Sequence, residues 1–201
     1  MKKLFSIVLM MFCALTISAQ TDVTTFLGIP VDGFKADMRK KLIEKGFTPK
    51  TVGENEFLEG EFNGHDVRVY IVTNNNKVYR IMLVDRNGTD EAQIKIRFNN
   101  LCYQFEKNER YSSEDMTIPE DEDISYEMSV HDKIYEAIFF QKSVLPTGLV
   151  LTEDDAKAAA RAYTEATLKK PVWFRIGETA GQYYIYMYYD NEYNKANGED
   201  L

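Results

Sequence analysis

Cysteine and histidine are scarce in this sequence, and the few that occur exclude common stabilising and catalytic devices. The 201 residues contain two cysteines and two histidines. Cys13 lies in the apolar N-terminal segment, so removal of that segment would leave Cys102 without a disulfide partner. His65 and His131 each precede an aspartate, a pair typical of exposed turns, and no HExxH motif or cysteine pair supplies further zinc ligands. We therefore expect no disulfide framework and no metal.

Recognisable catalytic and phosphate-binding motifs are also missing. No serine lies in a GxSxG turn, and there is no glycine-rich phosphate loop. The 32 Asp and Glu residues outnumber the 24 Lys and Arg residues, and no basic cluster offsets the formal net charge of −8. Such a surface repels phosphate backbones. We expect no nucleic-acid partner, no cofactor and no catalytic set. The alternative is a hydrolase of envelope polymers or peptides that uses dispersed acidic residues.

The N-terminus has the pattern of a secretory signal peptide. Lys2 and Lys3 precede an apolar run over residues 4–17, and Ser18, Ala19 and Gln20 supply a small, weakly polar end. The run is shorter than the roughly 20 residues of a membrane span. We expect cleavage near Ala19 or Gln20, and a periplasmic or secreted chain with no transmembrane segment. Residues 1–20 hold two cations and no acids, so their loss changes the formal net charge from −8 to −10.

The remaining residues, 21–201, predict a single α+β domain. With 44% hydrophobic and 13% aromatic residues in the whole chain, disorder is excluded. A helix over residues 32–45 is capped by Asp32 and ended by Gly46. Strands follow at 57–62, 67–73 and 78–84, and the Asn63-Gly64 turn and other short turns between them require antiparallel pairing.

The second half repeats this alternation with fewer strands. Thr89 caps a helix whose apolar positions recur at helical spacing: Ile94, Phe98, Leu101, Cys102 and Phe105. A polar loop over 108–123 precedes a predicted hairpin, with strands at 124–130 and 134–141 turning at His131-Asp132. Thr152 begins a third, alanine-rich helix ending near Leu168, for which we expect close packing. A last hairpin pairs 172–176 with 183–189.

The predicted order is therefore α-βββ-α-ββ-α-ββ, with the helices on one face of an antiparallel sheet. Residues 61–66 align weakly with 127–132 at an offset of 66, around the two His-Asp pairs. This suggests two helix-plus-hairpin repeats, about 26–86 and 88–142, followed by a C-terminal helix-hairpin at about 150–190.

A helix that leads into a three-stranded meander resembles the β-lactamase-inhibitor-protein-like fold and the small outer-membrane assembly lipoproteins. The sequence Leu27-Gly28-Ile29-Pro30 before the first helix shares this resemblance. It implies protein binding in a bacterial envelope, although the paired cysteines of the inhibitor and the lipobox of the lipoproteins are absent. Residues 183–191 and 197–201 are similar to the tails of uncharacterised secreted bacterial proteins, which implies no function.

The last predicted strand is rich in tyrosine and offers the clearest candidate surface. Alternation places Tyr184, Tyr186 and Tyr188 on one face, with Trp173 on the hairpin partner. Tyrosine rows bury large areas at low entropic cost, so these four residues form a candidate binding surface. The alternative is cross-strand packing inside a sheet covered on both sides. The expected partner is an envelope protein or polymer; its identity and the oligomeric state stay open.

Acidic clusters suggest a further alternative, a calcium-stabilised structural protein. Carboxylates are dense at 114–115 and 120–123, and the tail carries Asp190, Glu192, Asn194, Asn197 and Asp200. Calcium takes such oxygen ligands, but neither spacing matches an EF-hand loop.

Overall fold

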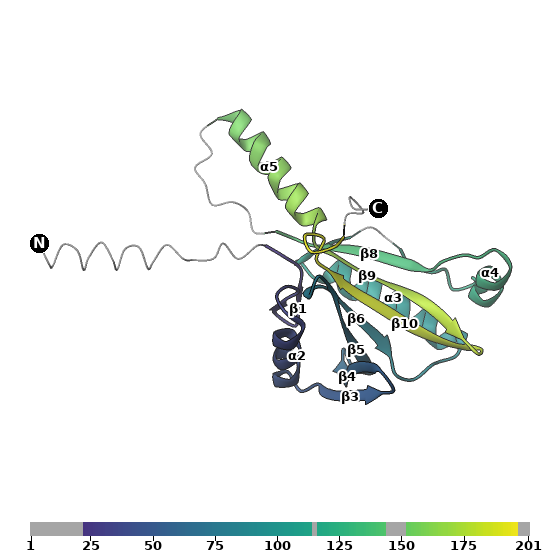
Figure 1. The fold of residues 1–201 in the computed structure, drawn as a ribbon. Helices are drawn as coiled ribbons and strands as arrows, with labels where there is room; N and C mark the ends of the chain where they lie inside the picture. The colour runs from purple at the N-terminus through teal and green to yellow at the C-terminus, as the bar shows by residue number, and fades with distance from the viewer. Residues whose placement is uncertain (1–21, 114–115, 144–151, 197–201) are drawn as a thin grey trace, which may run out of the picture.

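One large antiparallel sheet organises the chain (Figure 1). The computed structural model describes residues 22–113, 116–143 and 152–196. The elements in chain order are β1 (Thr25–Phe26), β2 (Ile29–Pro30), α2 (Lys35–Glu44), β3 (Thr48–Val52), β4 (Asn55–Phe62), β5 (His65–Asn74), β6 (Lys77–Asp85), α3 (Glu91–Lys107), β7 (Tyr111–Ser113), α4 (Ile124–Val130), β8 (Glu136–Gln141), α5 (Glu153–Leu168), β9 (Pro171–Thr179) and β10 (Gln182–Asp190). The predicted α+β class with an antiparallel sheet is confirmed.

The sheet consists of two four-stranded meanders joined side by side. Its strand order is β3-β4-β5-β6-β10-β9-β8-β7, and β1 and β2 form a separate two-stranded sheet. One helix precedes each meander, α2 the first and α3 the second, while α4 and α5 interrupt the second. The expected boundary between the second repeat and the C-terminal helix-hairpin, near residue 142, lies between β8 and β9. These two strands pair with each other within the second meander.

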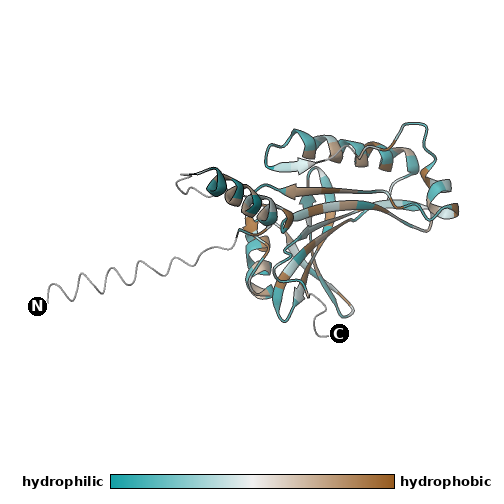
Figure 2. Cartoon of the chain, turned by 90° about the horizontal axis from the view of Figure 1, so that it is seen from above, coloured by the Kyte–Doolittle hydropathy of each residue, from teal (hydrophilic) through white to brown (hydrophobic). Residues whose placement is uncertain are grey.

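Both long helices that precede the meanders cover the same face of the sheet. α2 contacts β5 and β6, and α3 contacts β10, β9 and β7. Their apolar side chains join one core with the alternate, inward side chains of the strands. Paired positions across six strands form a row of buried residues, which we name the core row: Leu58, Val69, Leu83, Met187, Phe174 and Ala137. In Figure 2 the strands alternate between brown and paler segments, as expected for strands with one buried face.

The helix termini confirm the predicted end of α2 and correct its start. Gly46 has φ 99°, and Phe47 N–H donates to the carbonyl of Leu42, as in a Schellman motif. The helix begins after Phe34 rather than at Asp32, and no side chain caps it. In α3 the predicted buried set is confirmed residue by residue, but Asp90, not Thr89, accepts the capping hydrogen bond from Gln93 N–H.

Residues 124–130 contradict the predicted strand, because they form the helix α4. Asp123 caps this helix by accepting from Tyr126 N–H, and Ile124 is buried. β8 pairs with β9 along one edge and with the short β7 at the end of the other, and residues 124–130 join neither edge. The segment 127–132 therefore differs in conformation from the β4–β5 hairpin with which it aligned.

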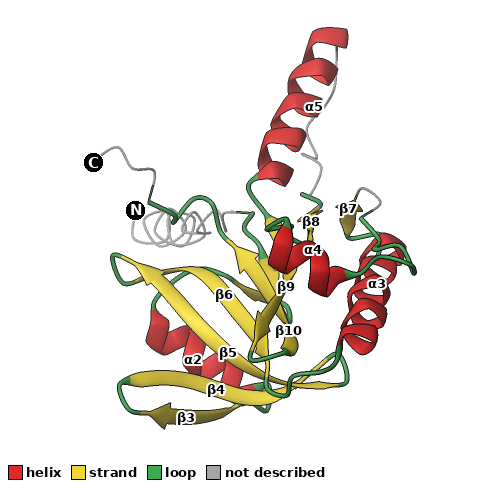
Figure 3. Ribbon diagram, turned by 90° about the vertical axis from the view of Figure 1, so that its right-hand side faces the viewer, coloured by secondary structure: helices red, strands yellow, loops and turns green. Residues whose placement is uncertain are grey.

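The helix α5 contradicts the expected close packing. Thr152 and Asp155 form the predicted capping box, but only Thr167 is buried within the helix. Figures 1 and 3 show that α5 projects away from the sheet, with its C-terminal end close to the sheet and its N-terminal end far from it. The described residues include no helix that is both long and apolar enough to cross a membrane.

Candidate functional site

The face of the sheet opposite α2 and α3, here named the open face, carries a second row of large side chains. These side chains lie one residue away from the core row on the same strands, and neither α2 nor α3 covers them. We name them the platform row: Phe57, Tyr70, Met82, Tyr188, Trp173 and Ile138. Five strand spacings of about 4.8 Å make this row about 24 Å long. It is long enough to contact an extended segment or a protein surface.

Charged side chains flank the platform row. A further row of paired positions on the same face contains two arginines and two glutamates, and we name it the arginine row: Glu59, Arg68, Val84, Tyr186, Arg175 and Glu136. Arg68 lies 5.6 Å from the ring centre of Phe57 and 3.6 Å from a Glu59 oxygen. Among the described residues the guanidinium of Arg175 has no hydrogen-bond or ion-pair partner, and the side chain is exposed. Arg175 is therefore available to an external carboxylate.

A stacked cluster fixes the middle of the platform row. The rings of Trp173 and Tyr188 are 3.9 Å apart and nearly parallel, at 17°. The guanidinium of Arg80 lies 4.9 Å from the Tyr188 ring centre. Asp190 accepts from Arg80 Nε at 2.6 Å and Nη2 at 2.7 Å, and from Trp173 Nε1 at 3.1 Å. This carboxylate raises the pKa of Arg80, and it holds both the cation and the indole in place.

The four predicted surface residues lie on this one face. Tyr188 pairs with Trp173, Tyr186 with Arg175 and Tyr184 with Gly177. Tyr188 is only 5% exposed, because Trp173 and Arg80 cover its ring, so it supports the surface more than it forms it. The Tyr186 ring packs against the backbone of Gly177, since a Cβ atom added to Gly177 would lie 2.5 Å from Tyr186 Cε2.

The sequence prediction missed the contribution of the first meander to this face. Phe57, Tyr70 and Met82 extend the platform beyond the tyrosine strand, and Arg68 and Arg80 add the charges. Alternation along β5 does set Arg68 and Tyr70 opposite the buried valines, but it does not show which strands lie beside them. No local signal could have shown that β6 would pair with β10, about 100 residues away in the chain.

Lysine is almost absent from the strands that form the open face. The chain has 16 lysines and 8 arginines. In β4, β5, β6, β8, β9 and β10 the only lysine is Lys77, at the first position of β6. Arginine, tyrosine, tryptophan and methionine are enriched at protein interfaces, whereas lysine is depleted there. The open face therefore has the composition of an interface rather than that of an ordinary solvated surface.

A pocket of about 690 Å³ lies at the α5 end of the open face. Its floor includes Ile138, Phe140 and Trp173, and Leu168 and Lys169 at the end of α5 form part of its wall. Leu168 is 53% exposed although it is apolar. The pocket could hold a large apolar side chain presented by a partner.

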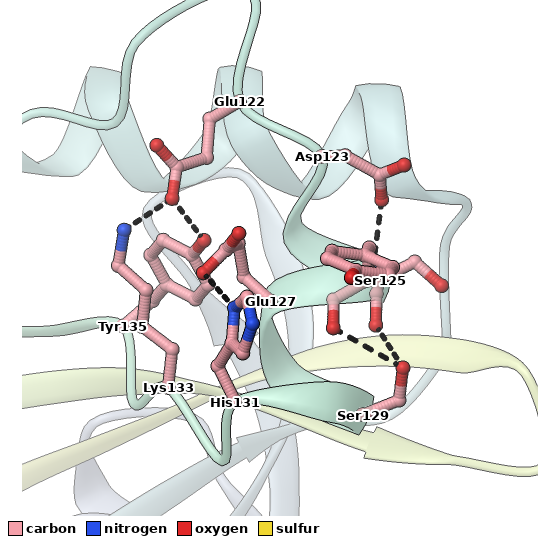
Figure 4. A network of polar contacts seen from close by, with 9 residues as sticks. Glu122, Asp123, Ser125, Glu127, Ser129, His131, Lys133 and Tyr135 are labelled. Atoms are coloured by element: carbon pink, nitrogen blue, oxygen red, sulfur yellow. Dashed lines mark hydrogen bonds and ion pairs between the residues drawn. The ribbon is translucent and has the colours of Figure 1, made fainter.

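A separate polar network surrounds α4 (Figure 4). Glu122 accepts hydrogen bonds from Lys133 and from the Tyr135 hydroxyl. These bonds lower the pKa of Glu122, while burial and the Glu122 carboxylate raise that of Tyr135. His131 pairs with Glu127 at 2.9 Å, so this histidine is used within the network. His65 lies on β5 and is not part of it, so the structure does not bring the two histidines together.

The acidic residues considered for calcium are largely engaged in other contacts. Residues 114–115, Asn197 and Asp200 lie outside the described residues. Asp190 is paired with Arg80, and Glu192 with Lys195. Across the ranges that the structure describes, no group of three or more His, Cys, Asp or Glu residues is arranged to hold a metal ion.

Comparison with known proteins gives no significant match to a family model, a curated protein or a solved structure.

Proposed function

We propose that the chain is a binding module of the bacterial envelope whose open face docks a protein partner. The observation that supports this most directly is the six-strand platform of aromatic, methionine and arginine side chains, left uncovered by α2 and α3 and nearly free of lysine. A face meant only for solvation would be expected to carry the lysines that dominate the rest of the chain.

The charges on the face indicate the chemistry of the partner. Arg80 is neutralised by Asp190 and Arg68 lies near one carboxylate, whereas Arg175 has no ion-pair partner within the described part of the chain. A complementary partner presents at least one carboxylate to Arg175 and apolar side chains to Trp173 and Met82. The pocket beside Leu168 would take one anchoring side chain, since hot-spot residues fill such pockets.

Site-specific photo-crosslinking tests this proposal. A benzophenone amino acid replaces Tyr184 on the open face, and in a matched control it replaces Tyr103, a 59% exposed tyrosine on α3. We expect the Tyr184 position, and not the Tyr103 position, to crosslink one protein in cells. The purified pair should then bind each other in solution. Equal crosslinking at both positions would contradict the proposal.

Charge reversal on the open face is a second, independent test of the proposed docking. Arg175→Glu should weaken binding of the purified partner at least tenfold, because a carboxylate would face a carboxylate. Arg39→Glu, an exposed residue of α2, is the matched control and should leave binding unchanged. Retention by purified peptidoglycan in place of a protein would overturn the choice of partner.

Export is part of the same proposal. It rests on the signal-peptide pattern of residues 1–20, which lie outside the described residues. Cell fractionation and N-terminal sequencing test it, with a mature chain expected to begin at Gln20 or Thr21. A chain that retains Met1 in the cytoplasm would contradict it.

A further inference from the structure

A second pocket lies on the opposite side of the sheet from the open face. Its volume is about 420 Å³. It is lined by the C-terminal half of α3, the β1–β2 hairpin, the β4–β5 turn and the inward residues of β10. Residues between 108 and 111 and Gln141 of β8 complete the lining, and none of the lining residues belongs to the platform row.

The lining combines an apolar body with fixed polar groups. Leu27, Phe62 and Phe105 supply the apolar part. The amide of Gln141 is held by Thr25, whose N–H donates to Oε1 at 2.8 Å and whose carbonyl accepts from Nε2 at 2.7 Å. Such a preorganised mixture of aromatic walls and few polar groups is typical of small-molecule sites.

Tyr111 offers a hydrogen-bond donor to this pocket. Its hydroxyl oxygen accepts from Gln141 Nε2 at 3.1 Å. Burial raises the pKa of the Tyr111 hydroxyl, so the group keeps its proton at neutral pH. Since its oxygen already accepts from Gln141, this hydroxyl can donate its proton to a ligand in the pocket.

Arg110 places a positive charge beside that donor. Among the described residues its guanidinium meets no carboxylate; its one contact is to Asn108 Oδ1, 3.4 Å from Nε. In an acidic protein, an unneutralised arginine at the mouth of an aromatic pocket favours a negatively charged ligand.

The backbone at Leu27 supports a ligand-binding role. Leu27 has φ 51° and Gly28 has φ 78°, so a bulky apolar residue occupies the left-handed region at the tip of the β1–β2 turn. Asparagine or glycine adopts this conformation at lower cost. Leu27 is also 39% exposed, so core packing does not explain why a leucine is there. Strained residues of this kind occur at binding sites.

We propose that this pocket binds a small amphiphilic carboxylate, with its carboxylate between Arg110 and the Tyr111 hydroxyl and its apolar body against Leu27 and Phe62. The site is independent of the proposed docking face, because it lies on the other side of the sheet.

Calorimetric titration of the mature protein with 4-phenylbutyrate tests the inference, with the neutral 4-phenylbutanol as the matched ligand. We expect the carboxylate to bind at least tenfold more tightly than the alcohol. Arg110→Gln and Tyr111→Phe should each weaken the carboxylate roughly tenfold and leave the alcohol unchanged. Arg39→Gln is the control and should change neither. Equal binding of the two ligands, or no binding of either, would overturn the proposal.

A variant that improves folding separates a binding role of Leu27 from a structural one. Leu27→Asn relieves the left-handed conformation and removes the apolar wall, so the Tm should rise while affinity for 4-phenylbutyrate falls several-fold. Unchanged affinity in this variant would exclude Leu27 from the site. Arg175→Glu should leave this titration unchanged even if it abolishes protein docking, so the two proposals fail separately.

Discussion

The core row and the platform row lie one residue apart on the same six strands, yet their compositions differ. The core row contains aliphatic residues, Met187 and Phe174, all buried on the face that α2 and α3 pack against, whereas the platform row contains Trp173, two tyrosines and three other large apolar residues. Both rows lie on the same strands, so they share the same strand pairing and the same sheet twist. The difference therefore comes from what covers each face. Packing against the helices explains the composition of the core row, whereas binding to a partner would explain the aromatic residues and arginines on the open face.

The largest expected effect is on the core row. Phe174→Ala removes a fully buried ring between Phe98 and Phe139, and we expect it to cost about 4 kcal/mol of unfolding free energy. Trp173→Ala, its neighbour on the platform row, should cost about 2 kcal/mol, because the half-buried indole leaves no enclosed cavity. Urea denaturation at pH 7 measures both. Equal losses would show that the two rows are equally buried.

Asp190 holds the middle of the platform row and should give the next largest effect. Asp190→Ala leaves Arg80 half-buried without its carboxylate, at an expected cost of about 3 kcal/mol. The matched control is Asp66→Ala, which breaks the exposed pair with Arg86 and should cost less than about 1 kcal/mol. A similar loss in both variants would contradict the assigned role of Asp190 as the fixed centre of the platform row.

Gly177 tests whether the platform depends on close approach. A methyl group at Gly177 would lie 2.5 Å from Tyr186 Cε2, so Gly177→Ala must turn that ring. Because a ring can swing toward solvent, we expect a cost of only about 1 kcal/mol, together with loss of partner crosslinking from Tyr184. Thr179→Ala, at the exposed end of β9, should alter neither measurement.

A smaller effect on stability is expected from the exposed charge of the open face. Arg175→Glu places a like charge opposite Glu136 and should cost about 0.5 kcal/mol. The swap Arg175→Glu with Glu136→Arg should restore that stability without restoring partner binding. Recovery of both would indicate that the pair acts within the sheet and not on a partner.

The smallest effect should come from the Glu122 network, away from both rows. Hydrogen bonds from Lys133 and Tyr135 lower the folded-state pKa of Glu122 below its unfolded value. The stability that these bonds contribute is present above the unfolded pKa and is lost as pH falls through the folded pKa. The Tm difference between the native chain and Glu122→Gln should therefore shrink between pH 7 and pH 3. A constant difference would contradict the assigned network.

Several elements could be predicted because their signals are local. In α3 the spacing of Ile94, Phe98 and Leu101 specifies one apolar stripe, and Gly46 ends α2 through a conformation that favours glycine. The last hairpin and its outward tyrosines also followed from alternation alone. Local hydrogen bonding and side-chain periodicity decide such features whatever the rest of the chain does.

Other elements had no such local signal. The strand β3 is exposed along its whole length, so it shows no alternation to detect. In residues 124–130, Ile124 and Met128 fit the same face of a strand or of a helix, and the sequence pattern predicted a strand. In the structure they form α4, which Asp123 caps, and β9 rather than this segment pairs along β8. The alanines of α5 predicted close packing, but the helix projects from the sheet.

The sequence by itself determined the class of the fold, its antiparallel hairpins, the stripe of α3 and the shared face of Trp173 and the β10 tyrosines, because these depend on neighbours a few residues apart. Only the tertiary structure decided that β6 pairs with β10 and so joins two meanders into one six-strand platform. It alone also placed Arg110, Tyr111 and Leu27 around one pocket. Contacts between residues about 100 positions apart depend on how whole elements pack. Short-range sequence patterns therefore do not indicate which distant strands will pair.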